Sequence, residues 1–220
     1  MRAVNQTFNS STRASRHAWT LVAMSAAALA LTGGLGACAG KHAKDPTLVP
    51  QRDRAAELAQ AQRFQEQAFA AQKDEEYERA ISLYAQAVQI DSSLGAAWHN
   101  AGICYMELKQ YLDAKASFLR AAELLTTDPR PYENLAVLYL RQGFGREAYE
   151  AYGLALERDP YSLAALRGST RAIRSLRLVS TDAQSRLLRG LEVEPETRWR
   201  EIMTTERIRV DAGLREEARR

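Results

Sequence analysis

A spacing of 34 residues organises the middle of this 220-residue chain. Between about residue 61 and residue 162, the same kinds of side chain return three times at that interval. The four rows are aromatic (Phe64, Trp98, Tyr132), small (Ala80, Ala114, Ala148), aromatic (Tyr84, Phe118, Tyr152) and small (Ala87, Ala121, Ala155). Four rows in one register indicate three copies of a single structural unit.

Elementary packing explains why these residue types recur. Small side chains at a helix crossing let two backbones approach to about 8–10 Å, and aromatic rings fill the space between one helix pair and the next. One such pair cannot bury its own apolar face, whereas three stacked pairs share a continuous core. The sequence therefore predicts an all-α solenoid of three helix pairs, at about 61–94, 95–128 and 129–162, with a curved groove along the first helix of each pair.

The middle copy is the most complete, with Trp98, Ala101-Gly102, Tyr105 and Ala114 at regular positions. This pattern resembles the tetratricopeptide repeat (TPR). The resemblance implies helix-turn-helix units that bind a protein or peptide partner in the groove. The first copy departs from the pattern, because Gln67 and Ala71 stand where the family has Leu and Tyr, and its first helix is expected to begin early, so that the repeat region spans residues 55–162.

The amino terminus has the pattern of an export signal. A polar stretch with several arginines precedes an apolar run of about 14 residues, Trp19 to Thr32, which is too short to cross a bilayer comfortably. The sequence Leu35-Gly36-Ala37-Cys38 that follows resembles the lipobox of bacterial lipoproteins. The resemblance implies removal of residues 1–37 and attachment of lipid, including palmitate-type acyl chains, to Cys38. The alternative is an ordinary signal cleavage site near Cys38.

Residues 38–54 read as the lipidated cysteine and a flexible tether, because Asp45-Pro46 and Val49-Pro50 interrupt a polar stretch. Several acyl chains anchor a protein firmly without spanning the membrane. In enteric-type bacteria, an Asp directly after the lipidated cysteine favours retention of the lipoprotein in the inner membrane. In this chain that position is Ala39. The expected location is the cell envelope, with the lipid in the outer membrane and the protein facing the periplasm.

The groove is expected to have an apolar centre and polar edges, which suits an extended or helical peptide with apolar anchors. Asn100 and Asn134 are candidates for binding the backbone of such a ligand, although Asn is common at that repeat position for structural reasons. The carboxylate clamp of chaperone-binding members does not match, because Gln65, Phe69 and Asn134 replace residues that it requires. The expected groove residues are Gln65, Phe69, His99, Asn100, Ile103, Met106, Arg130, Asn134, Val137, Leu140 and Arg141.

Residues 163–220 are expected to close the solenoid. Leu163 to Leu178 reads as a capping helix, and its arginines, at 167, 171, 174 and 177, read as a solvated face in preference to a phosphate or lipid-headgroup site. A capping-box spacing at Thr181 starts a helix that stops near Gly190, and a last helix follows Pro195. That last helix either folds back on the solenoid or offers a second interface through Trp199, Ile202 and Met203.

The residues of this chain do not predict catalytic activity. The three histidines, at positions 17, 42 and 99, provide no metal pair and no catalytic triad, and Gly143 and Gly145 fall in a turn. No cofactor is expected beyond the lipid on Cys38. A net charge of +3 does not favour nucleic acid, and Cys104 is expected to be a buried, inert thiol.

The sequence thus predicts a non-enzymatic, membrane-anchored periplasmic adaptor. It resembles TPR lipoproteins that assist pilus, secretion, outer-membrane or cell-wall assembly. A peptide-binding chaperone and a self-associating structural lipoprotein are the alternatives, and neither the partner nor the oligomeric state follows from the residues.

Overall fold

The computed structural model describes residues 51–220, with side chains from Arg54 onward. The predicted signal sequence, Cys38 and the tether up to Pro50 lie outside the described residues. The described part is helical throughout, and its helices are α1 (Gln51–Lys73), α2 (Tyr77–Ile90), α3 (Gly95–Glu107), α4 (Tyr111–Leu124), α5 (Arg130–Arg141), α6 (Gly145–Arg158), α7 (Leu163–Leu176), α8 (Thr181–Val193) and α9 (Thr197–Glu217). None of these helices is both long and apolar enough to cross a membrane.

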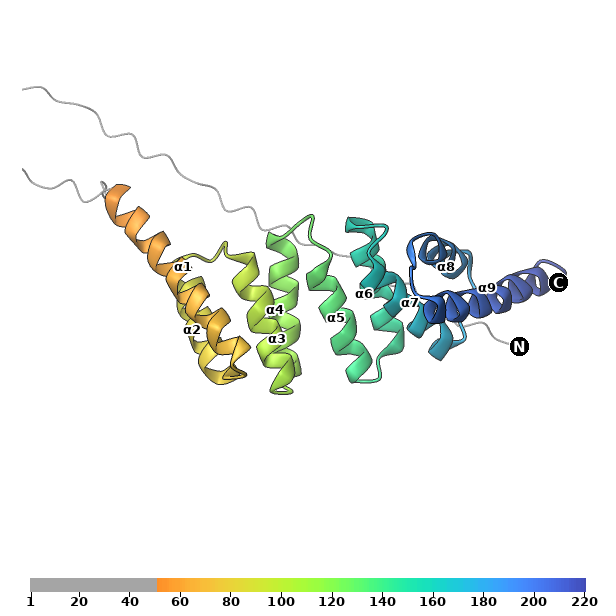
Figure 1. Cartoon of the computed structure of the whole chain (residues 1–220), viewed down its shortest axis with the longest axis horizontal. Helices are drawn as coiled ribbons and strands as arrows, with labels where there is room; N and C mark the ends of the chain where they lie inside the picture. Colours follow the sequence, from red (N-terminus) through yellow and green to blue (C-terminus); the bar gives the residue numbers. More distant parts are fainter. Residues whose placement is uncertain (1–50) are drawn as a thin grey trace, which may run out of the picture. The chain divides into compact units, whose positions relative to one another are not determined.

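The helices pack in chain order, so that each mainly contacts the ones before and after it (Figure 1). The three predicted pairs are α1 with α2, α3 with α4, and α5 with α6. Helix α1 begins at Gln51, four residues before the predicted start at Ala55, so the end of the predicted tether is helical. The reason is compositional, because nothing after Pro50 breaks a stretch rich in Ala, Glu and Gln.

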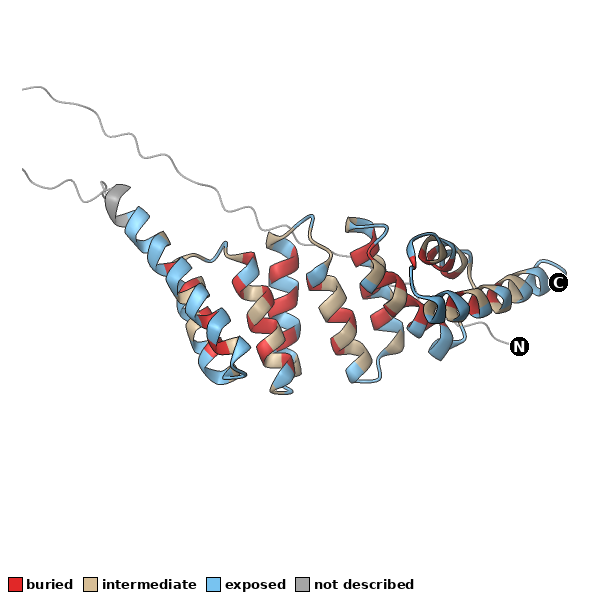
Figure 2. Cartoon of the chain, viewed as in Figure 1, coloured by how far each residue is buried: buried red, intermediate tan, exposed pale blue. Residues whose placement is uncertain are grey.

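The repeated residues form the core that the spacing predicted (Figure 2). Both rows of alanines are fully buried, and so are Tyr84 and Phe118, while Tyr152 is 2% exposed. Gly102 shows why the crossing needs a small residue: a Cβ placed there would lie 2.6 Å from Cε1 of Phe118. The aromatic row at 64, 98 and 132 is half-buried at the edge of this core.

The turns inside the helix pairs repeat as strictly as the side chains. A residue with positive φ follows each first helix, at Glu75 (61°), Lys109 (60°), Gly143 (82°) and Arg177 (50°), always 34 residues apart. The same turns share a backbone hydrogen bond that closes the helix end, from residues 76, 110, 144 and 178 to the carbonyls of residues 71, 105, 139 and 173. This is the Schellman pattern of helix termination. The register therefore continues past the third repeat.

Helices α7 and α8 are the predicted capping helix and the short helix that follows it, and their turn continues the register of the three repeats as a fourth helix pair. The aromatic position of α4 and α6 is taken in α8 by Arg186, which is 8% exposed. Its guanidinium stacks 3.8 Å from the ring of Tyr149 and donates to the Tyr149 carbonyl at 2.8 Å. The hydroxyl of Ser180 caps α8, one residue before the predicted Thr181, and the helix continues to Val193 instead of stopping near Gly190.

Helix α9 folds back across α7 and α8. Met203 and Val210 are fully buried with Ile173 and Leu187. Helix α9 therefore packs on α7 and α8, while Trp199 and Ile202 stay half-buried. The prediction of Met203 as part of a second interface is wrong, because its side chain belongs to the core, where its sulfur lies 2.8 Å from a Cβ placed on Gly190.

Candidate protein-binding groove

The first helices of the four pairs, α1, α3, α5 and α7, carry the predicted groove; we call their corresponding surface the first-helix face. Its centre is apolar, as expected. Ile103, Val137 and Leu140 are half-buried and pack on the main core, so each offers part of its side chain to a ligand. Because their lower atoms are held in the core, these side chains form a pre-ordered apolar strip.

Two predicted groove residues are structural instead. Met106 is 5% exposed and belongs to the core, and His99 is 7% exposed with its ring centroid 6.0 Å from that of Phe118. Nδ2 of Asn134 lies 2.8 Å from Nε2 of His99, which links the second repeat to the third. The Nδ2 atom of Asn134 is therefore engaged within the protein, while its side chain stays half-exposed on the first-helix face.

The protonation state of His99 agrees with this contact. An amide nitrogen can only donate, so the bond requires an unprotonated Nε2. Burial, with a smaller contribution from Arg130, lowers the pKa of His99 below its ordinary value. The imidazole is therefore neutral at pH 7 and acts as a fixed acceptor between two repeats.

Ion pairs line the edges of the first-helix face. Nη2 of Arg141 lies 3.0 Å from Oε1 of Glu107 in the preceding repeat. Arg130 binds both carboxylate oxygens of Asp128, with Nη2 at 2.6 Å from Oδ2, and this contact lowers the pKa of Asp128. Both arginines are exposed at the surface, where ion pairs contribute little to stability and remain able to exchange partners.

The first repeat offers a different surface. Phe69 is 51% exposed, and Nζ of Lys73 lies 5.8 Å from its ring centroid. Gln65 and Asn100 are half-buried, and Gln65 Oε1 has no hydrogen-bond partner among the described residues. The exposed ring of Phe69 is therefore the accessible group of this surface, since Gln65 Oε1 is itself buried.

The fourth pair extends the first-helix face with basic residues. Arg171 and Arg174 of α7 come 34 residues after Val137 and Leu140, and α7 contacts α5 directly. The two arginines line a pocket of about 350 Å³ together with Thr170, Glu196, Arg198, Trp199 and Ile202. The predicted solvated face of α7 is therefore partly covered, because Trp199 of α9 lies over it.

Two arginines of α7 contact the ring of Trp199 at this pocket. The guanidinium carbons of Arg167 and Arg171 lie 5.4 and 5.0 Å from the ring centroid of Trp199. Arg167 also binds the buried carboxylate of Glu194 through two hydrogen bonds of 2.8 and 2.6 Å. The burial of Glu194 could not be predicted, since a charged residue in a loop is normally exposed.

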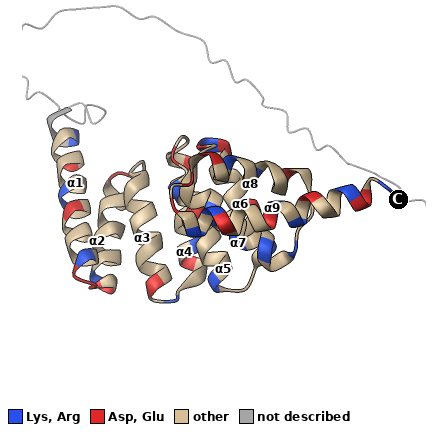
Figure 3. Cartoon of the chain, turned by 45° about the vertical axis from the view of Figure 1, so that its right-hand side comes forward, with Lys and Arg blue, Asp and Glu red and all other residues tan. Residues whose placement is uncertain are grey.

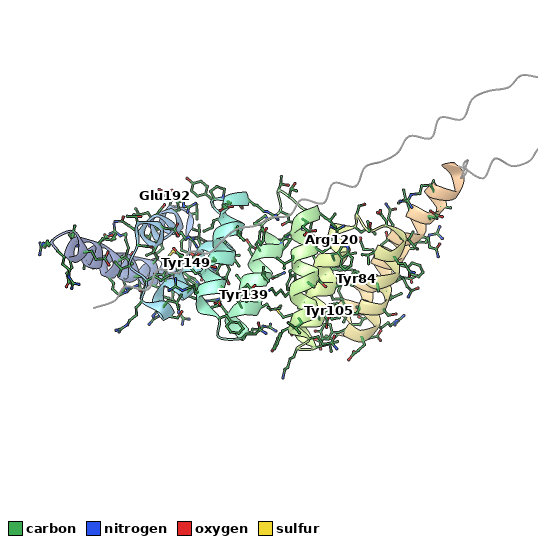
Figure 4. All side chains as sticks on the ribbon, turned by 180° about the vertical axis from the view of Figure 1, so that it is seen from behind. Tyr84, Tyr105, Arg120, Tyr139, Tyr149 and Glu192 are labelled. Atoms are coloured by element: carbon green, nitrogen blue, oxygen red, sulfur yellow. The ribbon has the colours of Figure 1, made fainter. Side chains whose placement is uncertain are left out.

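A second hollow lies on another face of α3. Trp98 and Tyr105 form its floor between α2 and α4, where two adjoining pockets measure about 380 Å³ each. One repeat later, the equivalent floor of Tyr132 and Tyr139 is covered, because Arg158 stacks 4.3 Å from Tyr132 and Lys115 lies 5.6 Å from Tyr139. Figure 4 labels Tyr105 and Tyr139. Sequence reasoning treated these aromatics only as packing residues.

Cys104 is fully buried, and burial raises the pKa of its thiol to about 11. The thiolate is the reactive form, so this side chain is inert at neutral pH, as predicted.

Residues 95–124, which form α3 and α4, match the model of the family described as tetratricopeptide repeat. Heat shock protein STI1 of Saccharomyces cerevisiae is 26% identical over 147 residues, which cover 62% of this chain. The match spans about a quarter (25%) of that relative's length.

Solved structures share the fold at low sequence identity. The Arabidopsis OM64 TPR domain superposes with a TM-score of 0.52 at 17% identity, covering 54% of this chain and 98% of that one. MamA gives 0.53 at 15% identity, covering 77% and 87%. The first TPR of Spaghetti (RPAP3), bound to the HSP90 peptide SRMEEVD, gives 0.51 at 20% identity, covering 55% and 95%.

Stacked helix pairs with a repeating turn and a common face define the class of α-solenoid repeat proteins. Within that class, the residue pattern, the family match and the structural neighbours agree. Residues 95–124 match the tetratricopeptide repeat, and the described helices share the fold of solved tetratricopeptide-repeat domains.

Proposed function

We propose that the chain is a membrane-anchored adaptor of the bacterial cell envelope, which holds a protein or peptide partner along the first-helix face. The observation that carries the binding role is the strip of Ile103, Val137 and Leu140, whose apolar side chains are half-exposed yet fixed by the core below. A rigid apolar strip costs little conformational entropy when a partner covers it.

The similar proteins support the proposed binding role, and the proposed location in the cell envelope rests on the sequence. Spaghetti (RPAP3) binds a peptide with the same kind of repeat. The envelope location rests on the sequence Leu35 to Cys38 and the apolar run before it, which support lipidation at Cys38 and an outer-membrane anchor facing the periplasm.

In-cell crosslinking followed by affinity capture and mass spectrometry tests the binding role. The double variant Ile103→Glu, Val137→Glu places two charges on the apolar strip, and we expect partner recovery to fall at least about tenfold, because an unpaired carboxylate must be desolvated on binding. The control Leu112→Glu, Ile208→Glu adds the same charge at positions that are 83% and 56% exposed. Circular dichroism verifies that both variants keep their helicity.

The composition of the captured set separates the alternatives. A few envelope proteins that the groove variant loses would support an adaptor, whereas many weakly held proteins would support a periplasmic chaperone. Recovery of only this chain would support self-association. If the groove variant captured the same partners as the unmodified protein, the first-helix face would not be the interface.

Membrane fractionation tests the anchor. We expect Cys38→Ser to move the protein from the membrane to the soluble fraction, because several acyl chains supply the membrane affinity. Cys104→Ser is the matched control, since Cys104 is buried in the solenoid and should not affect fractionation. Retention of the Cys38→Ser protein in the membrane fraction would refute a lipid anchor at this residue.

A further inference from the structure

The pocket between α7 and α9 has an excess of positive charge. Among the residues that line it, Arg171, Arg174 and Arg198 are basic and Glu196 is acidic. Figure 3 shows basic residues on α7 beside the mixed charges of α9. The Glu196 carboxylate accepts a 2.6 Å hydrogen bond from Arg167, which also binds Glu194, so Glu196 offsets part of the positive charge of the lining.

The three arginines are poorly compensated. Within the described chain, no carboxylate lies within ion-pair distance of Arg171 or Arg198. Arg174 reaches Glu206 only at 3.8 Å, and Glu206 is held more closely by Arg209 at 2.9 Å. Guanidinium groups that lack protein partners but share one concave site attract an anionic group from a ligand.

Arg171 is also held in place for such a contact. Its guanidinium lies over the ring of Trp199. The guanidinium of Arg167 also contacts that ring, and Arg167 is held in turn by an ion pair with Glu194. Stacking orients the planar guanidinium while leaving its N–H groups at the edge available to an acceptor. Ile202 adds an apolar wall to the pocket.

The location relates this pocket to the apolar strip. Arg171 and Arg174 occupy in α7 the repeat positions that Val137 and Leu140 occupy in α5, and the two helices touch. One ligand that follows the first-helix face would therefore meet apolar residues first and the arginines next.

We propose that the pocket formed by α7 and α9 binds the carboxylates of an acidic segment in the protein partner, next to the segment that covers the apolar strip. This inference rests on the proposed function, since it assigns the chemistry of one part of the bound partner. Charge complementarity decides for an acidic peptide, because the pocket lining has three arginines and a single glutamate.

Fluorescence anisotropy with the full-length chain tests the pocket directly. The probe is a labelled peptide whose first half alternates Leu and Ala and whose second half is four Glu; a matched probe has four Gln instead. The variant is Arg171→Gln, Arg198→Gln, and the control Arg63→Gln, Arg146→Gln removes the same charge from two exposed positions elsewhere.

We expect the glutamate peptide to bind more tightly than the glutamine peptide, with an advantage that shrinks as salt is raised. The Arg171, Arg198 variant should weaken the glutamate peptide by about tenfold and leave the glutamine peptide unchanged, while the control changes neither. Equal affinity for the two peptides, no binding of the glutamate peptide at low salt, or an unaffected variant would each overturn the proposal.

The strip variant separates this proposal from the adaptor role. If Ile103→Glu, Val137→Glu abolishes binding of both peptides and the arginine variant has no effect, the groove stands and the pocket fails. The reverse result would retain the pocket and reject the strip as the main interface. Vesicles containing phosphatidylglycerol form the last arm, and arginine-dependent binding to them without binding to the glutamate peptide would replace the acidic segment by a lipid headgroup.

Discussion

At the scale of single residues, burial decides which polar groups bind partners and which hold the fold. His99, Asn134 and Glu194 all have polar side chains that sequence patterns assign to surfaces. In the folded chain His99 and Glu194 are buried, and each has a hydrogen-bond partner on another helix or loop. Such groups are expensive to leave unpaired, so they specify one arrangement of neighbouring elements.

Glu194 gives a pH-dependent prediction. The hydrogen bonds from Arg167 hold the pKa of Glu194 below its usual 4.5. A carboxyl whose pKa is lowered by folding stabilises the folded state fully above its unfolded pKa, and this contribution is lost as the pH falls through the lower, folded value. Glu194→Gln should therefore reduce the free energy of unfolding by about 1–3 kcal/mol at pH 7.

The pH profile provides the sharper check on Glu194. Urea unfolding measured from pH 7 to well below pH 4.5 should show a smaller loss of stability in Glu194→Gln than in the unmodified chain, because this loss occurs between 4.5 and the lower folded pKa. Glu192→Gln is a suitable control because Glu192, labelled in Figure 4, is exposed two residues away. Parallel profiles for the unmodified and Glu194→Gln chains would contradict the assigned role.

At the scale of elements, side chains from one repeat complete the helix ends of another. Arg158, in α6, donates to the carbonyl oxygens of Ala122, Leu125 and Asp128 at 2.7 to 2.9 Å. These carbonyls lie at and after the end of α4, where only that of Leu125 also accepts a backbone N–H, from Asp128 at 3.2 Å. The same guanidinium covers Tyr132.

Arg158→Ala should therefore reduce the free energy of unfolding by about 2–4 kcal/mol, since it leaves several carbonyls without a donor and uncovers the ring. Thermal unfolding followed by circular dichroism measures this change. Arg146→Ala, an exposed position on the same helix, controls for the general loss of an arginine. Equal stability of the two variants would mean that water replaces the guanidinium without cost.

The elements also show how far the sequence could predict the fold. The three predicted pairs were found because their aromatic and small residues recur, and Gly102 must be small to accommodate Phe118. The fourth pair was not recognised as a repeat because Arg186 stands at the position where α4 and α6 have an aromatic residue. In the fourth pair the repeat is preserved in the backbone of the turn, which has the same positive φ and the same closing hydrogen bond. The residue types at that turn differ from those of the other pairs, so the sequence does not reveal the repeat.

The partial exposure of Val137 and Leu140 could be predicted, because it follows from their positions on the helix. The prediction failed at His99 and Met106 because the depth of a side chain depends on how closely adjacent helices approach. The basic pocket was missed for a related reason: its wall is completed by Trp199, more than twenty residues after Arg171 in the chain.

At the scale of the whole molecule, stability is distributed along the stack because each helix mainly contacts its neighbours in the chain. Met203→Ala removes a fully buried side chain from the cluster shared by α7, α8 and α9. We expect a local cost of about 2–4 kcal/mol. Amide hydrogen exchange should accelerate in α7 to α9 and change little in α3 and α4.

Ile208→Ala is the matched control for Met203→Ala, because Ile208 lies on α9 but is 56% exposed. Its exchange pattern should equal that of the unmodified chain. A uniform acceleration over all helices in Met203→Ala would instead mean that the solenoid unfolds as one cooperative unit.

The turns at residues 75, 109, 143 and 177 keep one geometry while their residues change from Glu to Lys to Gly to Arg. A repeat added at the boundary between α4 and α5 would therefore meet a matching surface on both sides. The added repeat would increase the separation between the arginine pocket and the first repeat by one repeat, and it would change neither the pocket nor the first repeat. The number of repeats thus sets the distance between Phe69 and Trp199, and with it the length that the proposed partner needs in order to contact both.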